Sequence, residues 1–206
     1  MATISRDPDR LVLFTDAVVA IAITLLILPL VDLAREPKPH AVDLITDNWT
    51  QILSFLLSFA VIARLWLIHH RMFQHVASYT PALVLVNMIW MFTVVVLPFP
   101  TEVISAASPD DRFPPLFYFC TILAGSVCQT ILSLIIHRNP DIQVPDNKLK
   151  PRIVAAAAIS TGMLMAGLVL MAAVPQVKYY ALLSLLLSRP AVVLLGRFYP
   201  SVREKE

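Results

Sequence analysis

The 206-residue sequence has 58% apolar residues, 15% charged residues and a mean hydropathy of +0.74. A water-soluble domain needs roughly a quarter of its residues charged, so this composition excludes one and predicts a membrane protein. The net charge is only +2 and no run of Lys or Arg exceeds two residues, which excludes a nucleic-acid-binding protein.

Six predominantly apolar segments follow one another along the chain. Each approaches the roughly 20 residues that a helix needs to cross a bilayer. The first contains Asp16 as its only charged residue, the second contains Arg64, and the sixth contains Arg189 before Pro190, which predicts a short or bent helix. We therefore predict an all-α membrane protein with six transmembrane helices per chain, at residues 11–31, 49–69, 81–101, 113–136, 153–174 and 179–198.

The whole chain, 1–206, is expected to form a single transmembrane domain, because the sequence has no visible internal repeat or domain boundary. Segment 137–152 is the longest polar connection, and its three prolines predict a loop. Ten Lys and Arg residues fall on the side of the N-terminus and four on the other side. The positive-inside rule then predicts a multi-pass protein of the cell membrane with both termini and the 137–152 loop in the cytoplasm.

No catalytic or metal-binding pattern is visible in the sequence. There is no Ser/His/Asp spacing, no pair of carboxylates within a span, no phosphate-binding loop and no selectivity filter of the TVGYG type. His69 and His70 are adjacent, so on a helix they point about 100° apart and are interpreted as interfacial or hydrogen-bonding residues. We therefore predict that the protein is not an enzyme and carries no cofactor.

Asp16 lies about one to two turns inside the first apolar segment, where a carboxylate is costly to desolvate and is usually paired and functional. A network that locks the first helix to the second and a role in gating are both compatible with this position. Its candidate partners, expected on the same side of the membrane, are Arg10, Arg64, Trp66 and His69.

The first segment also carries a stripe of residues at helical spacing. Ile21, Leu25 and Leu28 stand at i, i+4 and i+7, with Thr24 at i+3, so all four lie within about 100° of arc. Periodicity alone favours core packing, because this helix is apolar all round. Thr24, judged by itself, would be expected to bond the carbonyl four residues earlier rather than an ion.

Several motifs together resemble the transmembrane protein 175 family of potassium channels. Residues 10–16 read Arg-x-x-x-Phe-Thr-Asp, where the family hallmark is Arg-x-x-x-Phe-Ser-Asp, and an apolar run follows over 21–28. Residues 66–70 (Trp-x-x-His-His) and 87–99 (from Asn to Leu-Pro-Phe) are also similar to that family. The resemblance is specific over the first three predicted helices and architectural over the others. Thr15 replaces the family's Ser, which keeps the hydroxyl and adds a β-branch.

The resemblance implies a homotetramer in the lipid bilayer, with the first helix of each copy lining a central pore for potassium ions. By offset from the motif Asp, the hydrophobic constriction corresponds to Ile21, Leu25 and Leu28, and a hydroxyl ring that aids selectivity corresponds to Thr24. The network that supports the pore helix corresponds to Arg10, Phe14, Thr15, Asp16, Trp66 and His69.

These observations predict a potassium-permeable cation channel that lacks a carbonyl filter and closes by dewetting at its constriction. Two alternatives stay open. One is a proton-coupled secondary transporter in which Asp16, His69 and His70 form a relay, and the other is a non-conducting membrane scaffold. Pro29 removes one helix hydrogen bond just beyond Leu28, which predicts a bend that opens an outer vestibule.

Overall fold

The computed structural model describes residues 8–33, 35, 40–108 and 110–173. Among these residues, five helical stretches are long and apolar enough to cross a membrane: Asp9–Leu33, Trp49–Phe73, Pro81–Ala106, Phe113–Arg138 and Pro151–Ala173. The first five predicted spans are therefore confirmed. The sixth, 179–198, lies outside the described residues.

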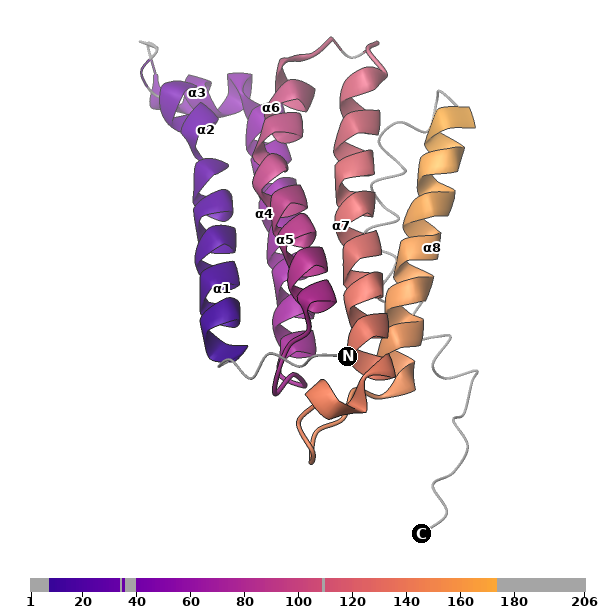
Figure 1. The fold of residues 1–206 in the computed structure, drawn as a ribbon. Coiled ribbons are helices and arrows are strands. Elements are labelled where there is room, and N and C mark those ends of the chain that lie inside the picture. The colour runs from indigo at the N-terminus through magenta and orange to yellow at the C-terminus, as the bar shows by residue number, and fades with distance from the viewer. Residues whose placement is uncertain (1–7, 34, 36–39, 109, 174–206) are drawn as a thin grey trace.

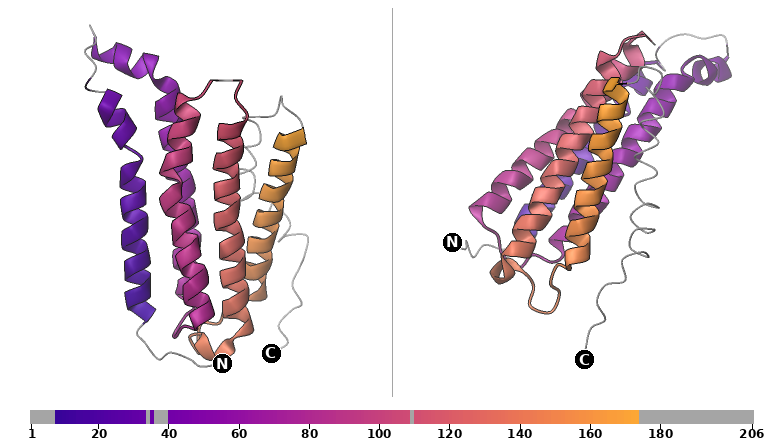
Figure 2. Two further views of the ribbon diagram at one scale, coloured as in Figure 1. Left: turned by 45° about the horizontal axis from the view of Figure 1, so that its top comes forward. Right: turned by 90° about the vertical axis from the view of Figure 1, so that its right-hand side faces the viewer.

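The spans lie side by side as a helical bundle (Figure 1). Helix α1 (Pro8–Leu25) packs against α4 (Trp49–Phe73) and α5 (Pro81–Val96). Helix α5 packs against α7 (Phe113–Arg138), and α7 packs against α8 (Pro151–Ala173). In Figure 1 and in the left view of Figure 2, α1 and α8 lie at opposite edges of the described bundle.

The first span is interrupted because Pro29 has no N–H to donate to the carbonyl of Leu25. Helix α1 ends at Leu25, and α2 (Leu28–Leu33) begins after a two-residue turn. In this turn both N–H groups donate to carbonyls three residues back, at 3.3 Å each. The predicted bend thus exists, but it precedes Leu28 rather than following it, since the proline disturbs the turn on its N-terminal side.

The third span is interrupted in a similar way before Pro98. Helix α5 ends at Val96, Leu97 forms the junction, and α6 (Pro98–Ala106) continues to the upper end of the bundle in Figure 1. The N–H of Leu97 donates to the carbonyl of Val94, three residues back, at 3.2 Å. A short helix that was not predicted, α3 (Ala41–Asp47), precedes α4 at that same end.

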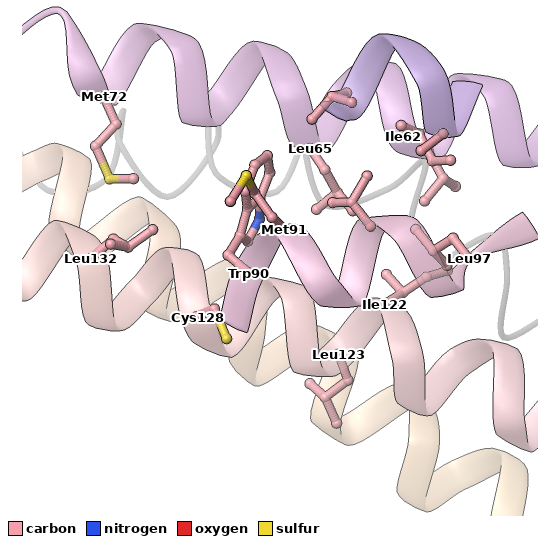
Figure 3. Close-up of a cluster of buried hydrophobic side chains, with 14 of the residues drawn as sticks. Ile62, Leu65, Met72, Trp90, Met91, Leu97, Ile122, Leu123, Cys128 and Leu132 are labelled. Carbon is pink, nitrogen blue, oxygen red and sulfur yellow. The ribbon is translucent and has the colours of Figure 1, made fainter. Parts of the chain in front are cut away.

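The core lies where α4, α5 and α7 meet (Figure 3). Ile62, Trp90 and Ile122, one from each helix, are at most 1% exposed. Helices α5 and α7 approach closely at Gly125, where an added Cβ would lie 3.0 Å from Oγ1 of Thr93. These three helices form the packed body against which α1 rests.

Segment 137–152 is docked onto the turn between α4 and α5. It contains the 3₁₀ helix η1 (Pro140–Ile142), and the carbonyl of Ile142 accepts from the N–H of Ala77 at 2.8 Å. The N–H of Val144 donates to the carbonyl of His75 at 3.0 Å. The predicted loop is thus held by backbone hydrogen bonds and lies among helix ends at the lower end of the bundle (Figure 1).

Candidate functional site

Helix α1 and the turn that follows it have one buried face and one open face. The face against α4 and α5 consists of four residues that are at most 3% exposed: Thr15, Val19, Ala22 and Leu26. On the opposite face, Ile21, Leu25 and Leu28 are 60%, 41% and 52% exposed. Periodicity alone favoured packing of this stripe in the core. The structure instead leaves the stripe exposed in the single chain.

Thr24 lies on the open face, between Ile21 and Leu28 along the chain. Its hydroxyl donates to the carbonyl of Ile21 at 2.8 Å, a bond within its own helix. A hydroxyl oxygen has two lone pairs, so this bond leaves the oxygen able to accept from, or coordinate, a ligand on the exposed side. Leu28 belongs to α2, so the stripe continues across the helix break.

Asp16 ties the lower part of α1 to the end of α4. Trp66 donates its indole N–H to Asp16, with Nε1 and Oδ1 2.8 Å apart. The other carboxylate oxygen lies 3.6 Å from Nδ1 of His70, and the side chain of Asp16 is 28% exposed. Trp66 and His70 are one turn apart on α4, with ring centroids 5.3 Å apart. Of the candidate partners of Asp16, the structure thus places Trp66 on the carboxylate.

A second network beside it is fully buried: Thr15, His69 and Asn87 are each 0% exposed. His69 Nε2 lies 2.7 Å from Oδ1 of Asn87, and the amide nitrogen of Asn87 donates to Oγ1 of Thr15 at 2.9 Å. The hydroxyl of Thr15 donates to the carbonyl of Leu11 at 2.8 Å. Because an amide oxygen only accepts, His69 donates from Nε2, and one directed chain of bonds joins α4, α5 and α1.

Two aromatic rings hold the imidazole of His69 in place. The ring of Trp90 stacks on it with centroids 4.0 Å apart and planes 11° apart. Phe73 also stacks on it, at 4.2 Å and 23°. This packing fixes the ring plane and directs Nε2 toward Asn87, so His69 serves the buried network rather than Asp16.

Arg10 and Phe14 are not brought to either network. Both are exposed, Phe14 at 54%, and Phe14 lies on the open face of α1. Within the described part of the chain, no hydrogen bond or ion pair involves Arg10.

Residues 10–98 match the family model described as the endosomal/lysosomal potassium channel TMEM175. The match includes the open face of α1 and every residue of the two networks. Over these residues the chain is similar to the TMEM175 family.

Proteins similar to this chain include bacterial and vertebrate channels. A potassium channel of Streptomyces collinus is 32% identical over 114 residues, and one of Chamaesiphon minutus is 36% identical over 126 residues. The rat endosomal/lysosomal proton channel TMEM175 is 29% identical over 154 residues. These matches cover 52%, 59% and 72% of this chain, but only 52%, 62% and 31% of those proteins. The aligned region thus spans about half of the Streptomyces protein and a third of the rat protein.

The fold is similar to that of a solved TMEM175 homolog. A crystal structure of the lysosomal potassium-selective channel TMEM175 homolog from Chamaesiphon minutus superposes with a TM-score of 0.70 and 24% identity. The superposition covers 92% of this chain and 97% of that chain. At this identity the likeness establishes the shared fold.

Two residues outside the predicted supporting network, His70 and Asn87, complete the networks of this chain. His70 faces Asp16, and its signal in the sequence is its place one turn after Trp66 on the same helix face. Asn87 bridges Thr15 and His69, and its signal is an amide inside an otherwise apolar, uncharged span. Buried amides need partners, so such a residue points to an interhelical bond.

Proposed function

We propose that the chain is a potassium-permeable cation channel in which α1 from several copies, four by family resemblance, lines a central pore in the bilayer. The observation that carries this proposal is the open face of α1, where Ile21, Thr24 and Leu25 are exposed while the opposite face is bonded to α4 and α5. Because α1 lies at the edge of the described bundle, a path along that face needs further copies to enclose it.

The proposed pore has a hydrophobic constriction and no carbonyl filter. Ile21, Leu25 and Leu28 offer no ligand to a cation, so a ring of them closes the path by dewetting, and opening requires widening for a hydrated ion. The hydroxyl of Thr24 is the polar group on this face and supplies the selectivity ring. Since the sequence has no filter of the TVGYG type, we expect modest selectivity for potassium over sodium.

The two networks are proposed to set the rotation of α1, so that its open face points to the pore axis. Trp66 and Asp16 hold one side of the helix, and His69 holds another through Asn87 and Thr15. Arg10 and Phe14 are exposed in the single chain, and we assign them to contacts with the neighbouring copy.

We place the protein in the cell membrane as a single six-helix domain over 1–206, with both termini and segment 137–152 in the cytoplasm. The charge distribution supports this orientation, since the positive-inside rule places Lys and Arg in the cytoplasm. Arg35 follows α2 and Arg112 precedes α7, and these helix ends lie at the upper end of the described bundle in Figure 1. The helix ends and the connection at its lower end carry more cations: Arg10 in α1, Arg71 in α4, Arg138 in α7, Lys148 and Lys150 in segment 137–152, and Arg152 in α8.

Flux from potassium-loaded liposomes tests the proposal, with wild type beside Ile21→Asn. The polar side chain makes the constriction wettable, so the variant should raise basal potassium flux several-fold. Ile89→Asn is the matched control, because Ile89 is also exposed (48%) but lies on α5. Unchanged flux from a correctly assembled Ile21→Asn protein, or an equal increase from the control, contradicts a constriction at Ile21.

The same liposomes separate the alternatives when a pH-sensitive dye is enclosed. Saturable potassium flux coupled to protons indicates the secondary transporter, and no flux from folded wild type and variant indicates the scaffold. The contacts of His69 do not favour a proton relay. Its Nε2 is bonded to the amide of Asn87, and an amide does not accept and release protons as a relay requires. Proton flux without coupling would make the chain similar in activity to the relatives named proton channels.

A further inference from the structure

Four exposed cations gather at the lower end of the bundle, where α7 ends and α8 begins (Figure 1). We refer to Arg138, Lys148, Lys150 and Arg152 as the basic cluster. In the described part of the chain, none of the four makes an ion pair. Their charges are therefore not compensated by an ion pair within the described residues.

The backbone that carries the cluster is held in place. Leu149 is 2% exposed; its N–H donates to Oε1 of Gln143 at 2.8 Å, and its carbonyl lies 3.1 Å from Nδ1 of His137. The amide of Gln143 in turn donates to the carbonyl of Ile136 on α7, at 2.8 Å. The cations on either side of Leu149 thus project from an anchored segment, next to the end of α7, and binding does not have to order a loose loop.

The same segment also carries two acidic residues. Asp141 precedes Ile142, whose carbonyl bonds Ala77, and Asp146 precedes Asn147, whose carbonyl lies 2.8 Å from Nδ1 of His75. Segment 137–152 therefore holds four cations (Arg138, Lys148, Lys150 and Arg152) against these two acids. Four positive and two negative side chains leave the segment with a net charge of +2, counting His137 as neutral.

The cluster adjoins an apolar stripe on α7. Ile131 lies two turns before Arg138 on the same helix face and is 40% exposed, and Cys120 and Ala124 continue this exposed face. This arrangement is complementary to a phospholipid. The cations lie where the lipid phosphate lies, at the membrane interface, and the apolar stripe lies where the acyl chains run along the helix.

We propose that the basic cluster binds the headgroup of an anionic phospholipid of the surrounding bilayer, with its acyl chains along the exposed stripe of α7. Arg138 and Arg152 supply forked donors for phosphate oxygens, and Lys148 and Lys150 supply point charges. This site is independent of conduction, because it depends on the segment between α7 and α8 and not on α1.

The test is a titration of the purified, detergent-solubilised protein with acyl-labelled phosphatidylglycerol and phosphatidylcholine, followed by fluorescence anisotropy. Wild type should prefer phosphatidylglycerol. The double variant Lys148→Gln/Lys150→Gln should bind it roughly 25-fold more weakly. Each cation near an anionic headgroup raises the affinity about fivefold, and two cations are removed. Lys148→Arg/Lys150→Arg keeps the charges and should retain the preference.

Four results would overturn the proposal. The first is equal affinity of wild type for the two lipids, and the second is unchanged affinity of the Lys→Gln pair for phosphatidylglycerol. The third concerns Arg112→Gln, a control at the opposite end of the bundle: an equal loss there indicates general surface charge. Inorganic phosphate is added in a parallel titration, and displacement of the labelled lipid by phosphate alone indicates a phosphate site instead.

Discussion

Replacement of Thr15 by Val tests whether the buried network holds α1 to the bundle. The substitution keeps the β-branched shape and removes only the hydroxyl, which accepts from Asn87 at 2.9 Å and donates to the carbonyl of Leu11. Thr15 and Asn87 are 0% exposed, so no water replaces the lost bond and an amide N–H of Asn87 is left without a partner.

The expected cost is set by that interhelical bond. Hydrogen bonds between helices in membranes average about 0.6 kcal/mol and reach about 1.7, while an unsatisfied buried donor costs about 1–3 kcal/mol. Full burial places Thr15→Val in the overlap of these ranges, so we expect the free energy of unfolding to fall by about 1–2 kcal/mol.

The assay is unfolding in mixed micelles with increasing denaturing detergent, followed by circular dichroism. Thr121→Val is the matched control, because the hydroxyl of Thr121 bonds only the carbonyl of Phe117 on its own helix, at 2.9 Å, among the described contacts. The control should change stability by less than about 0.5 kcal/mol. If Thr15→Val costs no more than Thr121→Val, the bond to Asn87 does not hold α1 in place.

Three further substitutions probe other contacts. Trp66→Phe removes the N–H that Asp16 accepts, and since that carboxylate is partly exposed we expect a loss of only about 1 kcal/mol in the same unfolding assay; wild-type stability would contradict the bond. Gly125→Ala brings a Cβ to 3.0 Å from Oγ1 of Thr93 and should destabilise by about 1–3 kcal/mol; if adding Thr93→Ala recovers nothing, the clash is not the cause. Thr24→Ala should shift the reversal potential toward that of sodium under bi-ionic conditions, and an unaltered value removes Thr24 from the selectivity ring.

The positions of the first five spans could be predicted because an apolar stretch of membrane length leaves few other structures open to it. The positions at which the helices are interrupted are harder to predict from the sequence. Pro29 is visible in the sequence, but its missing N–H acts on the carbonyl of Leu25, so the helix unwinds in the turn before Leu28. Composition therefore located the span and misplaced its break.

The polar networks could be predicted only in part, because apolar composition does not determine how a helix is rotated about its axis. Asp16 needed a partner, and Trp66 was one of its candidates. His69 and His70 differ by about 100° on α4, and only the packing against α5 decides which ring reaches Asn87 and which reaches Asp16. Sequence reasoning therefore found the carboxylate and not its full set of contacts.

The side-chain bonds of Thr15 and Asp16 lie near the cytoplasmic start of α1 in the proposed orientation, whereas the turn before Leu28 lies near its other end. Between these two points, the buried face of the helix is apolar, with Val19 and Ala22 as its contacts. Apolar contacts do not depend on direction, whereas hydrogen bonds require a narrow range of distance and angle. A small tilt of α1 about these polar bonds would therefore displace Leu25 more than it displaces Thr15 or Asp16.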